Sequence, residues 1–162
     1  MNQDEEIRKD VFAWFGSAAY AAQLFEVELV TLLIGQARLA DPNYSIEKLN
    51  DLDNLLSKKT LGQLLHEVKK HFTVSTEFEE ILMEYRDKRN YLAHHFFSKN
   101  GEKLLSISGC KEMAIELQEI YGSLREADQI VTKMSENVRT ASGINEEDFQ
   151  KYVNEQMKCI KA

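Results

Sequence analysis

Proline occurs once in this chain of 162 residues, and glycine occurs only 7 times. A fold built from β-strands needs many turns, and turns depend on these two residue types, so an all-β fold is excluded. Hydrophobic residues make up 43% and charged residues 29% of the chain, as in ordinary globular domains. We therefore predict an all-α protein in which residues 1–162 form a single domain.

Apolar residues recur with the helical period of 3.6 over two long segments, 4–38 and 111–139. Shorter amphipathic helices are expected at 45–56, 60–72 and 75–94, with a last one from Asn145. We expect a turn at Ser98–Gly101 and irregular backbone at 103–108. The resulting expectation is a helical bundle of two long helices and three to four shorter ones. The stripe of the first long helix contains Phe12, Phe15, Ala19, Ala22, Leu29, Val30 and Leu33.

Charge and cysteine content limit the classes of function. The formal net charge is −7, so nucleic acid has to be bound by a local basic surface, and a DNA-binding repressor is disfavoured. Cys110 and Cys159 form no disulfide framework, and no metal-ligand spacing is present, so no metal or cofactor is expected. An acidic N-terminus and the lack of a long uninterrupted apolar run indicate a cytoplasmic protein without a membrane segment.

Arg89 is the first residue that conflicts with its surroundings, because it lies in the middle of the apolar stripe of its predicted helix. Burying an unpaired guanidinium there would destabilise the fold by roughly several kcal/mol, so Arg89 requires a partner of opposite charge. Glu26 repeats the anomaly on the stripe of the first long helix, and we predict that it pairs with Arg89. Such a pair is compatible with both a purely structural role and a catalytic one.

Asn90 and His94 are four residues apart and therefore share one flank of the same helix. A histidine with an ordinary pKa of about 6.5 can act as a general acid or base. A neighbouring amide and guanidinium can hold a phosphate. RNA transesterification needs these two functions, proton transfer and stabilisation of charge on the phosphate, and it needs no metal.

The segment Arg89-Asn90-Tyr91-Leu92-Ala93-His94 resembles the Arg-x(4–6)-His motif of HEPN-domain proteins, in which a polar residue follows the arginine. The resemblance implies an all-α, HEPN-like helical bundle and a metal-independent endoribonuclease, such as a toxin or defence effector. It further implies that Arg89 contacts the scissile phosphate, Asn90 positions the motif and His94 is the general acid or base. It also implies a homodimer with facing motifs, and a cognate antitoxin or regulatory protein as a further partner.

Further residues near the motif are candidates for contact with RNA. Arg86 belongs to the few basic neighbourhoods of the chain, Tyr91 can stack on a base, and His95 adjoins His94, although adjacent helical residues point about 100° apart. A second interpretation is a non-catalytic dimeric HEPN-like interaction or nucleotide-binding module in which Arg89 and Glu26 are structural. Mannitol operon repressor-like proteins, which are not established nucleases, share a similar Arg-Asn-to-His segment.

Overall fold

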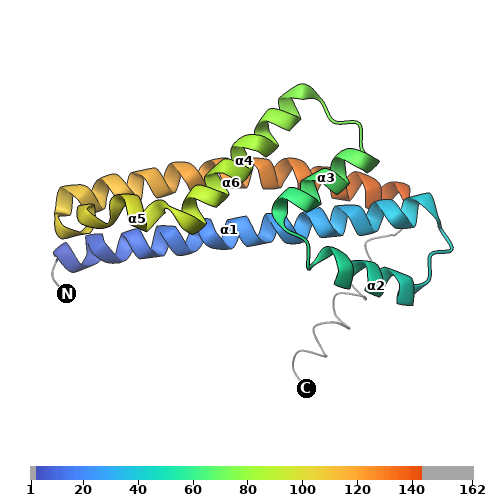
Figure 1. The fold of residues 1–162 in the computed structure, drawn as a ribbon, viewed down its shortest axis with the longest axis horizontal. Helices are drawn as coiled ribbons and strands as arrows, with labels where there is room; N and C mark the ends of the chain where they lie inside the picture. The colour runs from blue at the N-terminus through green and yellow to red at the C-terminus, as the bar shows by residue number, and fades with distance from the viewer. Residues whose placement is uncertain (1–2, 144–162) are drawn as a thin grey trace, which may run out of the picture.

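Two long helices, α1 (Gln3–Ala40) and α6 (Ile107–Ala141), lie side by side and run in the same direction in this computed structural model (Figure 1). The rings of Trp14 and Tyr121 meet near one end, and Gly35 lies against Val138 near the other. The structure describes residues 3–143, and within that range it contains helices and no strand, so the predicted all-α fold is confirmed. The remaining elements are α2 (Ile46–Leu56), α3 (Leu61–His71), α4 (Thr76–His94), α5 (Phe96–Asn100) and the short 3-10 helix η1 (Gly101–Leu105).

The core lies mainly between α1 and α6, and the shorter helices cover one side of this pair (Figure 1). Helix α4 contacts both long helices, so residues on its inner face meet α1 and α6 together. Phe12 departs from the predicted apolar stripe, because its side chain is 55% exposed and stacks on Phe97 at the surface. The fully buried large side chains are Tyr85, Phe25, Phe96, Leu29, Leu32, Leu64, Leu82, Met113, Leu117, Leu124, Val11 and Val68.

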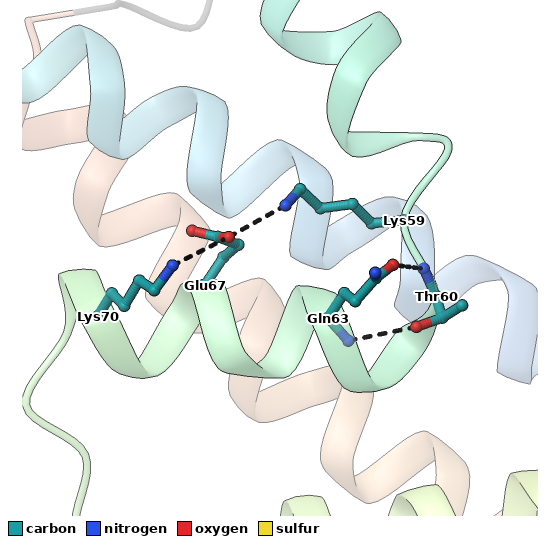
Figure 2. Close-up of polar contacts among 5 residues, drawn as sticks. All are labelled: Lys59, Thr60, Gln63, Glu67 and Lys70. Carbon is teal, nitrogen blue, oxygen red and sulfur yellow. Dashed lines mark hydrogen bonds and ion pairs between the residues drawn. The ribbon is translucent and has the colours of Figure 1, made fainter.

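Polar residues cap the starts of the short helices α2, α3 and α4. The hydroxyl groups of Ser45, Thr60 and Ser75 each accept a hydrogen bond from a backbone N–H in the first turn that follows. At Thr60 the side-chain oxygen of Gln63 also accepts a hydrogen bond from the backbone N–H of Thr60, which completes a capping box (Figure 2). Farther along α3, Glu67 accepts bonds from Lys59 and Lys70 and ties the α2–α3 connection to α3 (Figure 2).

The region after α4 is more helical than the sequence indicates. The turn predicted at Ser98–Gly101 is wrong, because α5 continues to Asn100 and η1 follows it directly. Asn100 is buried, and its amide donates to the carbonyl oxygen of Phe96 and the hydroxyl of Tyr91, so these internal partners replace the solvent that a turn would offer. The irregular backbone predicted at 103–108 is also wrong, since Ser106 caps α6 through Gly109 N and the helix begins at Ile107.

The structure does not test the predictions for the C-terminal segment and for the location of the protein. The amphipathic helix predicted from Asn145 lies outside the described residues. Helix α1 is long and apolar enough to cross a membrane, because an 18-residue window within it has a mean hydropathy of 1.4. A core helix of a soluble protein meets the same criterion, and 44% of that window is buried inside the bundle. The cytoplasmic location expected from the sequence therefore stays an expectation.

Candidate functional site

The predicted pair of Arg89 and Glu26 is confirmed. Arg89 Nε lies 3.0 Å and Nη2 lies 2.9 Å from the same carboxylate oxygen, Oε1 of Glu26. The side chains are 29% and 27% exposed, so the pair is half-buried at the contact between α4 and α1. A charge-assisted contact through one edge of the guanidinium fixes its plane as well as its position. The pair therefore holds Arg89 in one orientation.

Asn90 is the second residue bound to Arg89, since its Oδ1 accepts a hydrogen bond of 3.3 Å from Nη1. A guanidinium has five N–H donors, and the contacts to Glu26 and Asn90 use three of them. One N–H on each terminal nitrogen has no acceptor among residues 3–143. Arg89 thus keeps two donors that can bind an anion while it stays paired with Glu26.

Tyr85 is a buried residue of α4 close to this pair. Its ring stacks on Phe25 with centroids 3.8 Å apart, and its hydroxyl donates to the carbonyl oxygen of Ala22 in α1. Burial raises the pKa of Tyr85 far above its usual value, and the negative charges of Glu26 and Asp128 raise it further. This hydroxyl is therefore a fixed structural donor that ties α4 to α1.

Asp128 is a buried carboxylate at this side of α6 that sequence reasoning did not single out. Its Oδ2 lies 2.6 Å from Arg125 Nη1, and burial raises the pKa of its carboxyl although the guanidinium acts in the opposite direction. The sequence could have indicated this burial, because Asp128 follows Leu124 by four residues and precedes Val131 by three, and both neighbours belong to the apolar stripe of α6.

His94 and His95 mark the end of α4. Both side chains are exposed, and their rings meet edge to face with centroids 6.3 Å apart. His95 also ends the helix, because its N–H donates to the carbonyl oxygen of Tyr91. Neither ring forms a hydrogen bond or an ion pair within the described part of the chain. His94 is therefore open to a substrate, and Asn90 lies one turn before it on the same flank.

Tyr91 is held in a polar chain rather than left free on the surface. Its hydroxyl donates to Glu116 Oε1 at 2.7 Å and accepts from the Asn100 amide at 2.9 Å, while the ammonium of Lys99 lies 5.5 Å from the ring centre. Burial raises the pKa of Tyr91, and the bond to Glu116 adds to the effect. These contacts give Tyr91 a structural role that links α4, α5 and α6.

Arg86 is exposed on α4, one turn before Asn90, and binds Asp87 Oδ1 through Nε and Nη2. Other basic residues on or next to α3 and α4 are also paired with acids, namely Lys59 and Lys70 with Glu67, Lys69 with Glu79 and Lys88 with Glu84. The local positive field is therefore weaker than a count of lysines and arginines indicates.

Two pockets flank this part of the fold. One of about 190 Å³ lies between α3 and α4 and is lined in part by Arg86 and Met83. A larger one of about 290 Å³ lies among α1, α2 and α3 and includes none of the motif residues. Among residues 3–143, no group of three or more His, Cys, Asp or Glu side chains is arranged to hold a metal ion.

Comparisons with known proteins identify no relative. No family model matches the sequence, and neither a curated protein nor a solved structure matches it significantly.

Proposed function

We propose that the protein is a metal-independent endoribonuclease of HEPN type, with Arg89, Asn90 and His94 as its catalytic residues. The observation that carries this proposal is the state of Arg89, which Glu26 and Asn90 hold in place while two of its N–H donors stay free. A guanidinium fixed in this way can bind a phosphate without reorganising during the reaction. The exposed imidazole of His94, at the end of the same helix, supplies the group that can transfer a proton.

The proposed reaction proceeds in one displacement at phosphorus. The 2′-hydroxyl oxygen of a nucleotide attacks the adjacent phosphate and loses its proton, and the bond from phosphorus to the 5′-oxygen of the next nucleotide breaks. His94 performs one of the two proton transfers, either accepting the 2′-hydroxyl proton or donating a proton to the leaving 5′-oxygen, and water performs the other. The free N–H groups of Arg89 stabilise the charge on the non-bridging oxygens. The products are a 2′,3′-cyclic phosphate and a 5′-hydroxyl.

A homodimer with facing motifs forms part of this proposal. Arg89 and His94 are five residues apart, so their side chains leave the helix about 140° apart. Two copies of α4 that face each other can place the Arg89 of one copy near the His94 of the other. The exposed side chains of Asn90 and His94 share one flank of α4 and are available for such a contact.

Mixing two inactive variants tests the shared site. Arg89→Gln protein and His94→Ala protein are combined under conditions that exchange subunits, and RNA cleavage is measured. A shared site regains activity, because one of the two sites in the mixed dimer takes both intact residues. Two self-contained sites stay inactive in the mixture, and that result would contradict the facing arrangement.

The matched histidines of α4 provide the test of catalysis. The unchanged protein, His94→Ala protein and His95→Ala protein are each incubated in EDTA with total RNA and, separately, with DNA. We expect the unchanged protein and His95→Ala to cut RNA, His94→Ala to lose at least about 100-fold of the rate, and DNA to stay intact. Cleavage that stops in EDTA contradicts the proposed mechanism.

A second candidate function is a non-catalytic dimeric interaction or nucleotide-binding module. The observation that favours it is that Glu26 binds Arg89 in a way that would stabilise α1 against α4 without any ligand. For such a module His94→Ala changes the stability little, while Arg89→Gln lowers the free energy of unfolding. The toxin or defence role, with its cognate antitoxin, is proposed from the resemblance to HEPN proteins alone.

A further inference from the structure

The groove between α3 and α4 combines basic side chains with an apolar floor. His66 and Lys69 come from α3, and Arg86 comes from α4. Leu65, Leu82 and Met83 form the apolar part, and Met83 is 52% exposed. Gly62 also lines the groove, and the space beside it is open, since a Cβ at this position would meet nothing within 4 Å. The first half of α4 extends beyond the long pair in Figure 1.

The face of α4 that lines this groove continues directly to the proposed catalytic residues. Met83, Arg86, Asn90 and His94 follow one another at spacings of three and four residues and therefore share one flank of the helix. Arg86 and His94 are eight residues apart, which corresponds to about 12 Å along the axis. A strand that reaches His94 can therefore extend along α4 into the groove.

The lining of the groove contains two basic side chains and one acidic side chain, although the chain as a whole is strongly negative. Lys69 and Arg86 carry positive charge from opposite helices, and Glu79 is the one acid among the residues that line this groove. Asp87, which is outside the lining, binds Arg86 in an exposed ion pair that a phosphate can also displace. Glu79 Oε1 lies 3.0 Å from Lys69 Nζ, and both side chains are 41% exposed. Because this exposed pair is weak, an incoming phosphate can compete with Glu79 for Lys69.

We propose that the α3–α4 groove binds the single-stranded RNA next to the cleaved bond, with Lys69 and Arg86 on its phosphates and Met83 and His66 against a base. This inference rests on the proposed function and adds the place where the substrate is held. The volume of about 190 Å³ is below the range of ordinary small-molecule pockets, so the groove accommodates about one nucleotide of a longer strand. Positive charge beside an aromatic ring on which a base can stack is typical of single-strand binding, and His66 supplies that ring here.

The test measures binding separately from cleavage. Affinity for a fluorescein-labelled 12-nucleotide oligouridylate is measured by fluorescence anisotropy in EDTA, with His94→Ala as the parent protein so that the probe stays intact. Lys69→Ala and Arg86→Ala are each expected to weaken binding about 3- to 10-fold. The double variant is expected to lower the slope of log affinity against log salt concentration by about 1.4, because two phosphate contacts are lost.

Glu79→Gln provides a prediction of the opposite sign, since it removes the carboxylate that competes for Lys69. We expect this variant to bind the RNA several-fold more tightly than the parent. Lys133→Ala and Glu136→Gln are the matched controls, because Lys133 and Glu136 form an exposed ion pair on α6 outside the groove. They change the net charge by the same amounts, and we expect smaller effects from them.

The outcomes separate this inference from the proposed activity. Failure of the parent to bind the probe, or equal effects of the groove variants and the α6 controls, would overturn the groove as the RNA site. RNA that is bound through Lys69 and Arg86 but never cut by the unchanged protein would support the groove and contradict the nuclease. RNA that is cut at equal rates and bound with equal affinity by the groove variants would support the nuclease and overturn the groove.

Discussion

Glu26 Oε1 accepts two contacts from Arg89, one from Nε at 3.0 Å and one from Nη2 at 2.9 Å, across a sequence separation of 63 residues. This contact joins the middle of α1 to the second half of α4. Because the edge formed by Nη1 and Nη2 keeps free donors, the same pair can stabilise the fold and present Arg89 to a phosphate. Stability and activity therefore have to be measured separately for every change at these positions.

Loss of either partner is expected to destabilise the fold. Glu26→Gln and Arg89→Gln should each lower the free energy of unfolding by about 1–3 kcal/mol, less than for a fully buried pair because both side chains keep some solvent contact. Urea unfolding of both single variants and the double variant gives the coupling energy, which we expect at about 0.5–2 kcal/mol. Additive effects of the two changes would show that the pair contributes no interaction of its own.

Asn100 connects the end of α5 to α4 and is expected to be sensitive to replacement. Asn100→Ala removes the donors to Tyr91 and Phe96 and opens a small cavity, so we expect a loss of about 1–3 kcal/mol in urea unfolding. Ser98→Ala is the control, because Ser98 is exposed and only its hydroxyl bond to the carbonyl of His95 is lost. Equal effects of the two changes would argue against the buried role of Asn100.

Two glycines of α6 should respond in opposite ways to alanine. A Cβ on Gly109 would lie 2.3 Å from the backbone oxygen of Lys103, so Gly109→Ala has to displace η1 and should cost about 1–3 kcal/mol. A Cβ on Gly122 would meet nothing within 4 Å, so Gly122→Ala should stabilise the helix by about 0.5–1 kcal/mol. Thermal unfolding followed by circular dichroism compares the two variants, and a stable Gly109→Ala protein would contradict the close packing of η1 on α6.

Asp128 gives stability a defined pH dependence. Burial raises the pKa of its carboxyl above the ordinary 3.8, so folding disfavours its ionised form. The cost is complete above the raised pKa and disappears as the pH falls toward 3.8. Relative to Asp128→Asn, the unchanged protein should therefore gain stability as the pH is lowered from 7 to 4. A constant difference between the two proteins over that range would show that the pKa of Asp128 is not raised.

The sequence was most informative where one residue type conflicted with a regular pattern. The long amphipathic stripes predicted the two long helices, and one charge on the stripe of α1 and one on the stripe of α4 predicted the contact between Glu26 and Arg89. Both predictions depend on helical periodicity, which holds along the whole length of a helix.

The region from Ser98 to Ser106 shows where this reasoning fails. Ser98-Lys99-Asn100-Gly101 has the composition of a turn, but the side chain of Asn100 finds partners in Tyr91 and Phe96 that are placed by tertiary packing. Periodicity was also unable to show that Tyr91 binds Glu116, or that Asp128 approaches Tyr85 closely enough to affect its pKa. These contacts depend on how helices pack, and a single sequence contains no direct record of that packing.

Analysis of RNA fragment ends tests the central proposal most directly. Wild-type protein and His94→Ala protein are incubated with RNA in EDTA, and the termini of the products are determined. The account predicts 2′,3′-cyclic phosphate and 5′-hydroxyl ends that are produced by the unchanged protein and absent with His94→Ala. Fragments with the same ends from both proteins, or no cleavage of any RNA by the unchanged protein, would contradict a catalytic role for His94.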